Sequence, residues 1–378
     1  MFSKKLNIAM IGHKRIPSRE GGVEIVVEEL STRMVKKGNN VVCYNRRGKH
    51  ISGKEFGHKK AYKEYKGVKI RTIFAIDKKG IAAVTSSFAA AIDCIFRKYD
   101  VVHFHAEGPC AAIFIPHLFG IRTVATIHGL DWARAKWNNG LGSKYIKFGE
   151  KMAVKYADEI IVLSKGVQQY FKETYNRDTV LIPNGVTKPE IVQADEISKK
   201  WGLKKDEYIL FLGRIVPEKG IQYLIDAFKK VKTNKKLVIA GGMSDTIDFM
   251  AYMKKTAKCD DRIIFTGFVQ GKVLDELYSN AYIYTLPSDI EGMPLSLLEA
   301  LSYGNCCLTS DIAECADVIE DKGVTFKKSD VNDLTDKLQM LCDNSDVVEK
   351  YKSGVSDWIC GKYNWDDVTN KTLDLYKW

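Results

Sequence analysis

Two glutamates, Glu291 and Glu299, bracket the apolar run "GMPLSLL". Pro294 suits the first position of a helix, where its missing N–H costs nothing. Glu291 then precedes that helix, and Glu299 lies about a turn and a half inside it. The N–H groups of the first turn favour an anion such as phosphate. With a phosphate between them, the two carboxylates would each bind hydroxyl groups. One carboxylate would bind those of a sugar, and the other those of a ribose. A helix-capping Glu followed by a solvent-facing Glu is the alternative.

The segment "GRIVPEKG", residues 213–220, supplies positive charge. The Arg214 guanidinium offers a fork to two phosphate oxygens, and Lys219 offers a compact charge. Such cations stabilise the negative charge that develops on a diphosphate leaving group. A surface turn explains the same residues equally well.

The loop "GHKRIPSREGG" ends in two adjacent glycines, Gly21 and Gly22. Paired glycines let backbone N–H groups approach an anion closely just before a helix begins. Three basic residues lie on the same loop: Lys14, Arg15 and Arg19. The alternative here is a plain strand-to-helix turn.

His128 ends a strand-like run in "TIHGLD". A single His is more often structural than catalytic, but its place at the end of a strand favours contact with a ligand. His103 and His105 alternate on an earlier strand and are secondary candidates.

Short β-branched runs alternate with helical patterns, such as residues 23–38 and 221–231, which predicts parallel, doubly wound sheets. The expected strands are residues 6–12, 40–45, 68–74, 100–106, 122–129, 158–164, 179–186, 208–215, 236–242, 263–269, 281–288 and 306–310.

Pro, Asn and Gly cluster at residues 183–190, which indicates a linker. We therefore expect an α/β protein of two Rossmann-like domains, 1–186 and 187–364, that face each other across a cleft. A nicotinamide dehydrogenase is disfavoured, because the G-x-G-x-x-G fingerprint is missing after the first strand.

The composition is that of a soluble globular protein, with 378 residues, 45% of them hydrophobic and 28% charged. No run approaches the roughly 18 apolar residues of a membrane span. The nine cysteines are scattered without C-x-x-C spacing, which favours reduced thiols over disulfides or a zinc site. We expect a cytoplasmic protein.

The net charge of +11 is unevenly distributed. Residues 1–190 hold 33 Lys and Arg against 17 Asp and Glu, a net +16, and the remainder holds 25 against 30, a net −5. A basic half fits nucleic acid, anionic lipid or a polyanionic substrate, or a solvated surface. Nucleic acid is the weakest of these, because no recognition motif accompanies the charge.

Taken in order, these motifs resemble the retaining glycosyltransferases of family 4, which have the GT-B fold and include bacterial capsule and cell-wall polysaccharide enzymes. The resemblance covers essentially the whole chain. Its motifs are the Gly-Gly loop, "HG" at 128–129, "PNGV", "GRIVPEKG", "GFV" and "EGMPLSLLE". It implies that the first domain binds the acceptor, that the second binds the nucleotide sugar, and that residues 365–378 form a helix packing back on the first domain.

The resemblance also implies a role for each motif. Glu291 would hold hydroxyls of the donor sugar, and Glu299 would hold the ribose. Arg214 and Lys219 would grip the diphosphate, and His128 would contact the transferred sugar. Further donor contacts would come from Gly21, Gly22, Val269, Gly292, Met293, Pro294 and Leu295. Acceptor-side candidates are Lys14, Arg15, Arg19 and Asp131. One departure is Pro294, which removes an N–H donor where many relatives have Gly.

The implied reaction transfers a hexose or deoxyhexose from a nucleotide-diphosphate sugar to a glycan or lipid-linked acceptor, with retention of configuration. No Asp-x-Asp motif occurs in the chain, so we expect neither a metal nor another cofactor. The basic first domain would sit on the inner face of the cell membrane, and residues 81–99 form either a buried helix or an interfacial one. A non-catalytic nucleotide-sugar or glycan binding protein is the alternative from another class. An epimerase or a phosphorylase is a second enzymatic alternative.

Overall fold

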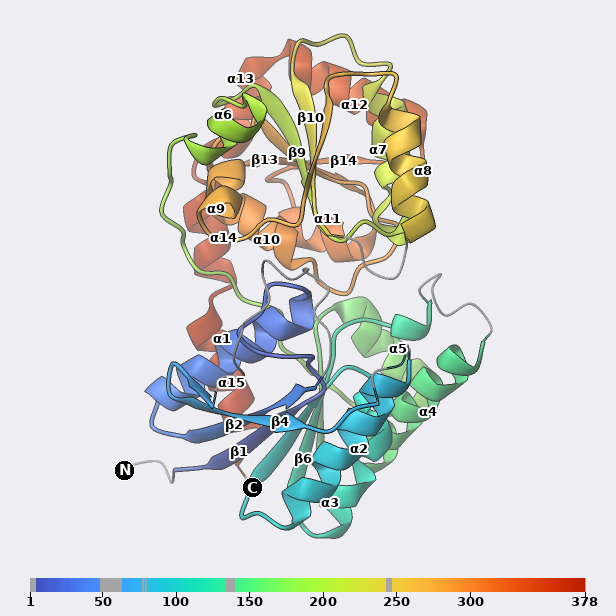
Figure 1. Cartoon of the computed structure of the whole chain (residues 1–378), viewed down its shortest axis with the longest axis vertical. Helices are drawn as coiled ribbons and strands as arrows, with labels where there is room; N and C mark the ends of the chain where they lie inside the picture. Colours follow the sequence, from blue (N-terminus) through green and yellow to red (C-terminus); the bar gives the residue numbers. More distant parts are fainter. Residues whose placement is uncertain are drawn as a thin grey trace. The chain divides into compact units, whose positions relative to one another are not determined.

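The computed structural model describes residues 5–47, 63–76, 78, 80–133, 140–242 and 247–377. The chain forms two compact units, one comprising Met1–Asn184 with Trp365–Trp378 and the other Gly185–Asn364. Each unit is an open sheet with helices on both faces (Figure 1). The fold is therefore the expected α/β arrangement of two Rossmann-like units.

The first unit contains an eight-stranded sheet in the order β3-β4-β2-β1-β5-β6-β7-β8. Its strands are β1 (Asn7–Ile11), β2 (Asn40–Arg46), β3 (Glu64–Tyr65), β4 (Val68–Ile73), β5 (Val101–His105), β6 (Arg122–Ile127), β7 (Glu159–Val162) and β8 (Val180–Leu181). All neighbours pair in parallel except β3 and β4. The long apolar strands expected from the sequence are confirmed, because buried parallel strands are apolar on both faces. The expected strand at 179–186 shrinks to two residues, since Pro183 has no N–H for a ladder.

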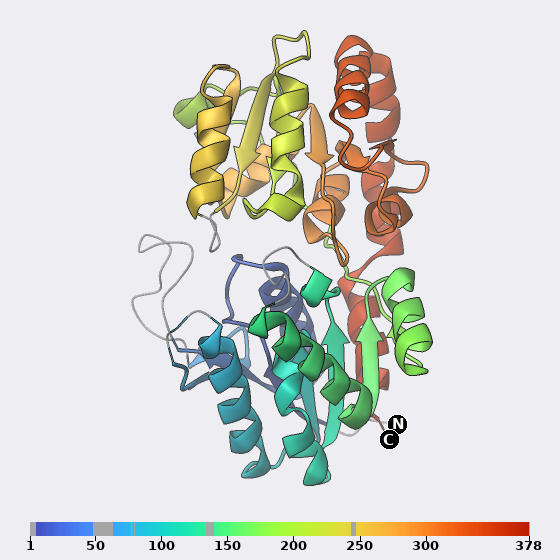
Figure 2. The same cartoon turned by 90° about the vertical axis from the view of Figure 1, so that its right-hand side faces the viewer.

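Helices cover both faces of this sheet. They are α1 (Gly22–Lys36), α2 (Ile81–Ile95), η2 (Pro109–Ala112), α3 (Phe114–Leu118), η3 (Asp131–Ala133), α4 (Leu141–Tyr156), α5 (Lys165–Tyr175) and α15 (Trp365–Asp374). Helices α2, α3 and α4 lie side by side (Figures 1 and 2). Helix α15, from the end of the chain, packs beside α1. The first unit therefore includes a helix from the far end of the sequence.

The second unit contains a six-stranded parallel sheet in the order β11-β10-β9-β12-β13-β14. Its strands are β9 (Tyr208–Leu212), β10 (Lys236–Ala240), β11 (Ile263–Gly267), β12 (Ile283–Leu286), β13 (Cys306–Ser310) and β14 (Val324–Phe326). Strand β14 was not expected, because three residues give too short an apolar pattern to recognise. The order reverses between β9 and β12, which is the point where such sheets bind ligands.

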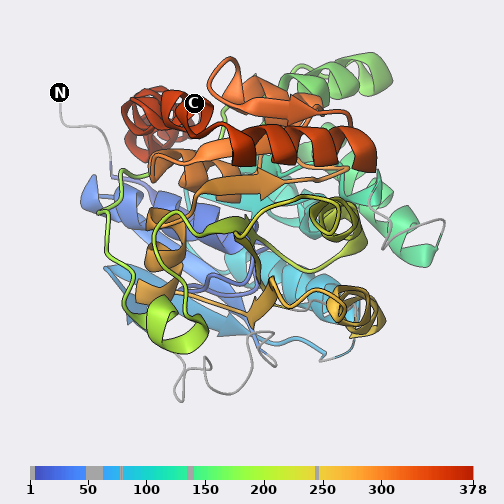
Figure 3. The ribbon, with the colours of Figure 1, turned by 90° about the horizontal axis from the view of Figure 1, so that it is seen from above.

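The helices of the second unit lie on both faces of its sheet, with α7, α8 and α12 on one face and α6, α9, α10 and α14 on the other (Figures 1 and 3). The elements are α6 (Glu196–Trp201), η5 (Pro217–Lys219), α7 (Ile221–Phe228), α8 (Ile247–Ala257), α9 (Lys272–Ser279), α10 (Leu295–Ser302), α11 (Ala313–Ile319), α12 (Val331–Asp343), α13 (Ser345–Lys352) and α14 (Val355–Lys362).

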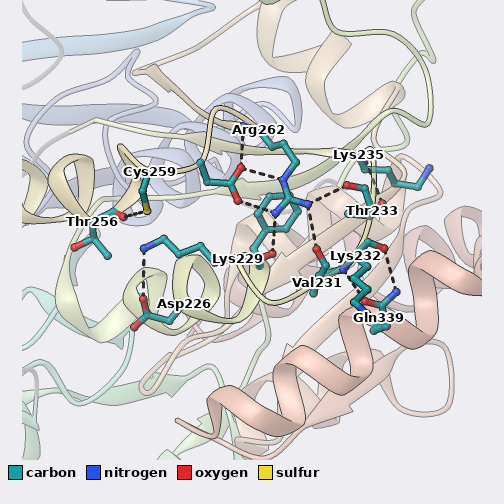
Figure 4. A network of polar contacts seen from close by, with 12 residues as sticks. Asp226, Lys229, Val231, Lys232, Thr233, Lys235, Thr256, Cys259, Arg262 and Gln339 are labelled. Carbon is teal, nitrogen blue, oxygen red and sulfur yellow. Dashed lines mark hydrogen bonds and ion pairs between the residues drawn. The ribbon is translucent and has the colours of Figure 1, made fainter.

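One arginine, Arg262, links several segments at the amino-terminal edge of this sheet through hydrogen bonds (Figure 4). Its guanidinium donates to both carboxylate oxygens of Asp260, at 2.9 and 2.7 Å, and to the carbonyls of Val231 and Thr233, at 3.1 and 2.9 Å. It also lies over the Phe228 ring. A planar fork that satisfies several oxygens ties the end of α7 to the start of β11. This network is structural, because it lies at the edge opposite the strand ends that carry the candidate site.

Candidate active site

In the second unit, the loop after β9 is held in place by close backbone contacts. A Cβ on Gly220 would lie 1.9 Å from the Pro287 carbonyl oxygen, and Gly220 has φ +67°. Only glycine allows both the left-handed backbone and this approach. The end of η5 therefore rests directly on the loop that leaves β12, and Lys219 is brought to Glu291.

Lys219 and Glu291 form an ion pair in which both side chains are largely buried, 14% and 8% exposed. The Ser288 hydroxyl donates to the same carboxylate at 2.6 Å, and the Ser310 hydroxyl donates to the Ser288 carbonyl at 2.5 Å. A buried carboxylate with a cation and a hydroxyl on it is a preorganised acceptor for hydroxyl groups. The alternative of Glu291 as a simple helix cap does not fit, since it is buried and no side chain caps this helix.

Helix α10 begins at Leu295, so the expectation that Pro294 is its first helical residue was wrong by one position. Pro294 is extended, with ψ 107°, and its carbonyl accepts the N–H groups of Leu297 and Leu298 at 3.1 and 3.3 Å. It therefore acts as the N-cap. The N–H groups of Leu295 and Ser296 come before these bonds and have no carbonyl within the helix to donate to, as in any α-helix. Met293 and Leu295 each expose 8% of their surface.

Glu299 lies inside α10 and is half-buried. The Tyr278 hydroxyl lies 3.2 Å from its Oε2 and also 3.2 Å from the Ser296 carbonyl. Burial, together with the charge of Glu299, raises the pKa of Tyr278 well above its usual range. Tyr278 therefore remains a hydrogen-bond donor that orients Glu299, which the sequence pattern did not reveal.

Three other donor-side candidates lie at the same edge of this sheet. Arg214 and Lys219 share the loop between β9 and α7, and Arg214 is half-buried. Val269 is half-buried two residues after β11, and Gly292 is buried before α10. Glu314, at the start of α11, carries a carboxyl whose pKa is raised by burial and by the charge of Glu291. Glu314 was not identified from the sequence.

In the first unit, the loop after β1 is tied to the end of β2. Asn45 Oδ1 accepts the Ile16 N–H at 3.0 Å, and Asn45 Nδ2 donates to the Ile16 carbonyl at 2.9 Å. Glu24 Oε1 accepts the Lys14 N–H at 2.9 Å. Side chains on two other elements thus fix the loop between β1 and α1 before any ligand binds.

The two glycines of this loop take the ordinary extended and helical conformations. Gly21 is the N-cap of α1, with φ −163°, and Gly22 is its first residue. A Cβ on Gly21 would lie 2.5 Å from Glu24 Oε2. Glycine is favoured here because any larger residue would force the Glu24 carboxylate to move. Lys14 and Arg15 are half-buried and Arg19 is exposed.

His128 follows β6 and contacts a row of histidines. Its Nε2 lies 3.2 Å from His105 Nδ1, and the His105 ring stacks on His103 with centroids 4.2 Å apart. His103 in turn lies 2.6 Å from the Tyr376 hydroxyl and 2.7 Å from Thr126 Oγ1. Burial lowers the pKa of His103 to about 3 and that of His105 well below its usual range, so both are neutral near pH 7. Of the two secondary candidates, His105 therefore contacts His128 directly, and His103 is connected to it through His105.

Asp131 lies in η3, three residues after His128, and its N–H donates to Glu107 Oε2 at 2.9 Å. Glu107 is fully buried, and burial together with the charges of Asp131 and Glu150 raises its pKa well above the usual range. Glu150 accepts the Trp132 indole N–H at 3.1 Å. The buried side chains of Glu107 and Glu150 therefore hold the loop that carries His128 and Asp131.

Both units match known protein families. Residues 20–188 match the family model described as Glycosyltransferase Family 4, and residues 193–358 match Glycosyl transferases group 1. An uncharacterized glycosyltransferase of Methanocaldococcus jannaschii is 27% identical over 74% of this chain and 75% of the relative. The UDP-Gal:alpha-D-GlcNAc-diphosphoundecaprenol alpha-1,3-galactosyltransferase of Escherichia coli is 27% identical over 74% of this chain and 76% of its own.

Among solved structures, the sucrose-phosphate synthase of Thermosynechococcus elongatus superimposes with a TM-score of 0.81 over 98% of both chains, at 18% identity. The two family models fall one on each unit, and the buried Lys219–Glu291 pair lies at the switch point of the second sheet. The chain belongs to the GT-B glycosyltransferases of the family 4 type.

Proposed function

We propose that this glycosyltransferase transfers a hexose or deoxyhexose from a nucleotide-diphosphate sugar to a glycan or lipid-linked acceptor, with retention of the anomeric configuration. The observation that carries the proposal is the buried Lys219–Glu291 pair beside the start of α10. Glu291 accepts hydroxyls of the donor sugar, and Glu299 accepts those of the ribose. Positive charge from Arg214 and Lys219, with the first turn of α10, stabilises the diphosphate as it leaves.

The first unit is assigned to the acceptor and the second to the nucleotide sugar. His128 contacts the transferred sugar, and Asp131, Lys14, Arg15 and Arg19 serve the acceptor. Reaction without a metal follows from the cationic residues, which replace the metal that other transferases place on the diphosphate. Activity that persists in EDTA supports this assignment, and loss of activity that Mg²⁺ restores would contradict it.

A thermal-shift screen with UDP-, GDP- and dTDP-sugars identifies the donor, since a ligand that binds only the folded state raises Tm. NMR of the product made from an α-linked donor then gives the stereochemistry. Retention yields the α-anomer, and a β-anomer would overturn the retaining assignment. A protein that binds a nucleotide sugar without turning it over would favour the alternative of a non-catalytic binding protein.

We further propose that the enzyme acts at the cytoplasmic membrane surface in the synthesis of a bacterial surface polysaccharide such as a capsule. In the described part of the chain, no helix has the length and apolar character to cross a bilayer. Several large apolar side chains on α2, α3 and α4 or at their ends are nevertheless exposed, among them Phe96, the C-cap of α2, at 80% and Leu141 at 85%. Helix α2 also has a buried side, with Ala90, Ala91 and Cys94 in the core. The buried side agrees with the expectation of a core helix at residues 81–99, and contact of the exposed side with the membrane remains part of the proposal.

Charge on α4 supports a membrane contact. Its exposed basic residues are Lys144, Lys147, Lys151 and Lys155, and its one acidic residue, Glu150, is buried. Each Lys near an anionic surface contributes about 1 kcal/mol. Further basic residues for such a contact were expected at 46–49, 54–71 and 78–79, of which 48–49, 54–62 and 79 lie outside the described residues.

Liposome co-sedimentation tests the membrane proposal. We expect binding to vesicles with anionic lipid, weaker binding to zwitterionic vesicles, and loss of binding in a Leu141→Ser, Phe148→Ser variant. Tyr252→Ser, which removes an exposed aromatic residue of the second unit, is the matched control. Equal binding by both variants would exclude this face, and no binding by the wild type would exclude the membrane.

A further inference from the structure

Arg46, the last residue of β2, carries a half-buried charge that no part of the proposed mechanism uses. Its Nε is buried and makes no hydrogen bond, and its guanidinium forms no ion pair with any residue that the structure describes. Its backbone N–H donates to the Lys14 carbonyl at 2.6 Å, which fixes it against the loop after β1. Burying a charged group whose N–H donor is left without a hydrogen bond is costly, so an arginine kept in this state points to a ligand.

A second guanidinium, that of Arg15, lies within electrostatic range of the first. Burial lowers the pKa of Arg46, and the nearby charge of Arg15 lowers it further, against the opposing effect of Glu24. Burial also lowers the pKa of Arg15. Glu24 is the carboxylate shared by both arginines, and its Oε1 already accepts the Lys14 N–H. Two like charges are thus held together, although each disfavours the other.

The position of this pair is that of a ligand site. Strands β1 and β2 are neighbours in the sheet, and Arg15 and Arg46 both lie at the carboxyl end of this pair. Open α/β sheets bind ligands at this edge. The Asn45 side chain holds the intervening loop at Ile16, so the site is built before a ligand arrives. Two planar forks at one place match the oxygens of a phosphate group.

We propose that Arg46 and Arg15 form a phosphate-binding site in the first unit, and that its ligand is a phosphate or diphosphate group of the acceptor. The assignment to the acceptor rests on the proposed function, in which the donor diphosphate is bound by Arg214, Lys219 and the start of α10. The donor is the other source of the same chemistry, and the experiments below separate the two.

The binding experiment uses inorganic pyrophosphate as the probe. It is carried out in an Arg214→Gln, Lys219→Met background, so that the second unit contributes little to binding. The apparent affinity for pyrophosphate is obtained from the rise in Tm that pyrophosphate causes. Adding Arg46→Gln is expected to weaken this affinity by about 10-fold, because charge-assisted hydrogen bonds are lost. Arg47→Gln, which removes the exposed neighbouring arginine, is the matched control and leaves binding unchanged.

Stability without phosphate provides a second readout. Arg46→Gln is expected to maintain or raise Tm in phosphate-free buffer, because it removes a half-buried charge whose Nε finds a hydrogen-bond partner only when the ligand binds. A structural arginine would give the opposite result. A lower Tm in phosphate-free buffer, or pyrophosphate binding equal to the background, would overturn the proposal. Arg46→Lys keeps the charge but loses the fork, so it should also weaken pyrophosphate binding, and binding as in the background would contradict the proposal.

Kinetics with a short-chain prenyl-diphosphate sugar distinguish the two sources of phosphate. In the otherwise wild-type enzyme, Arg46→Gln is expected to raise KM for this acceptor by about 10-fold and to leave KM for the donor unchanged. A rise in KM for the donor alone would assign the site to the donor and overturn the acceptor assignment. If no donor and acceptor give turnover, the proposed function fails, while the pyrophosphate experiment still decides the phosphate site.

Discussion

Lys219 and Glu291, 72 residues apart in the sequence, meet as a largely buried ion pair beside the start of α10. The family resemblance predicted that Lys219 binds the diphosphate and that Glu291 binds the donor sugar. Their contact means that the two roles are coupled, because each side chain holds the other in place until the donor binds. Removing one partner therefore affects both stability and catalysis, and these effects must be separated.

Lys219→Met is expected to lower kcat by about 100-fold, because it removes charge stabilisation of the leaving group. It should also destabilise the protein by about 3 kcal/mol, since Glu291 remains buried without its partner. In the double variant Lys219→Met, Glu291→Gln, stability recovers but kcat does not. Thermal melts and steady-state kinetics on the three proteins check this, with Lys230→Met as the control on an exposed lysine. Recovery of kcat in the double variant would mean that Lys219 acts only on Glu291.

Gly220→Ala is expected to lower Tm severely. The new Cβ would lie 1.9 Å from the Pro287 carbonyl oxygen, in a backbone with φ +67°. Gly354→Ala is the matched control, since Gly354 has φ +70° but nothing within 4 Å of the added atom. The control bears only the left-handed backbone cost of about 1 kcal/mol. Calorimetric melts of both variants should therefore differ clearly. Equal shifts in Tm would show that the approach of η5 to β12 is not tight.

The overall architecture could be predicted because buried parallel strands are continuous apolar runs, as in β1 and β9. The short strands β3 and β14 were missed because two or three residues give no periodicity. His103 and His105 were recognised only as secondary candidates. Their link to His128 depends on the register of β5 against β6, in which His105 pairs with Thr126. Register between parallel strands has no local signal in the sequence.

Other parts of the candidate site depend on contacts that no sequence spacing predicts. Tyr376 reaches His103 across 273 residues because α15 returns to the first unit. Arg46 was not singled out, since its significance lies in burial without a partner, which only a folded structure shows. Arg214 and Glu291 could be predicted to lie at one edge of the sheet, because both follow parallel strands and the loops after such strands share that edge.

Acid should destabilise the first unit through its buried histidines. Burial lowers the pKa of His13 from 6.5 to about 4 and that of His103 from 6.5 to about 3. Below pH 6.5 the unfolded chain binds protons that the folded chain does not, so stability falls as the pH falls from 6.5 towards these values. Between pH 7.5 and 5.5 each of these histidines is expected to cost about 1.4 kcal/mol. Urea unfolding at the two pH values measures the loss.

A His103→Gln variant supplies the comparison for this pH dependence. It removes one titrating group, so the loss of stability between pH 7.5 and 5.5 should shrink by about 1.4 kcal/mol. An unchanged loss in His103→Gln would show that His103 is not neutral in the folded protein.

The contact between His105 and His128 makes a final prediction about positioning. His105 Nδ1 lies 3.2 Å from His128 Nε2, and His105 itself is neutral, so one ring donates to the other and fixes its orientation. His105→Ala should therefore lower kcat by about 10-fold or more, as a displaced catalytic contact does, while the UDP-sugar-induced rise in Tm stays as in the wild type. His128→Ala should lower kcat further, and the double variant should be no worse than His128→Ala alone, because His105 acts through His128. Additive losses in the double variant would instead give His105 a role independent of His128.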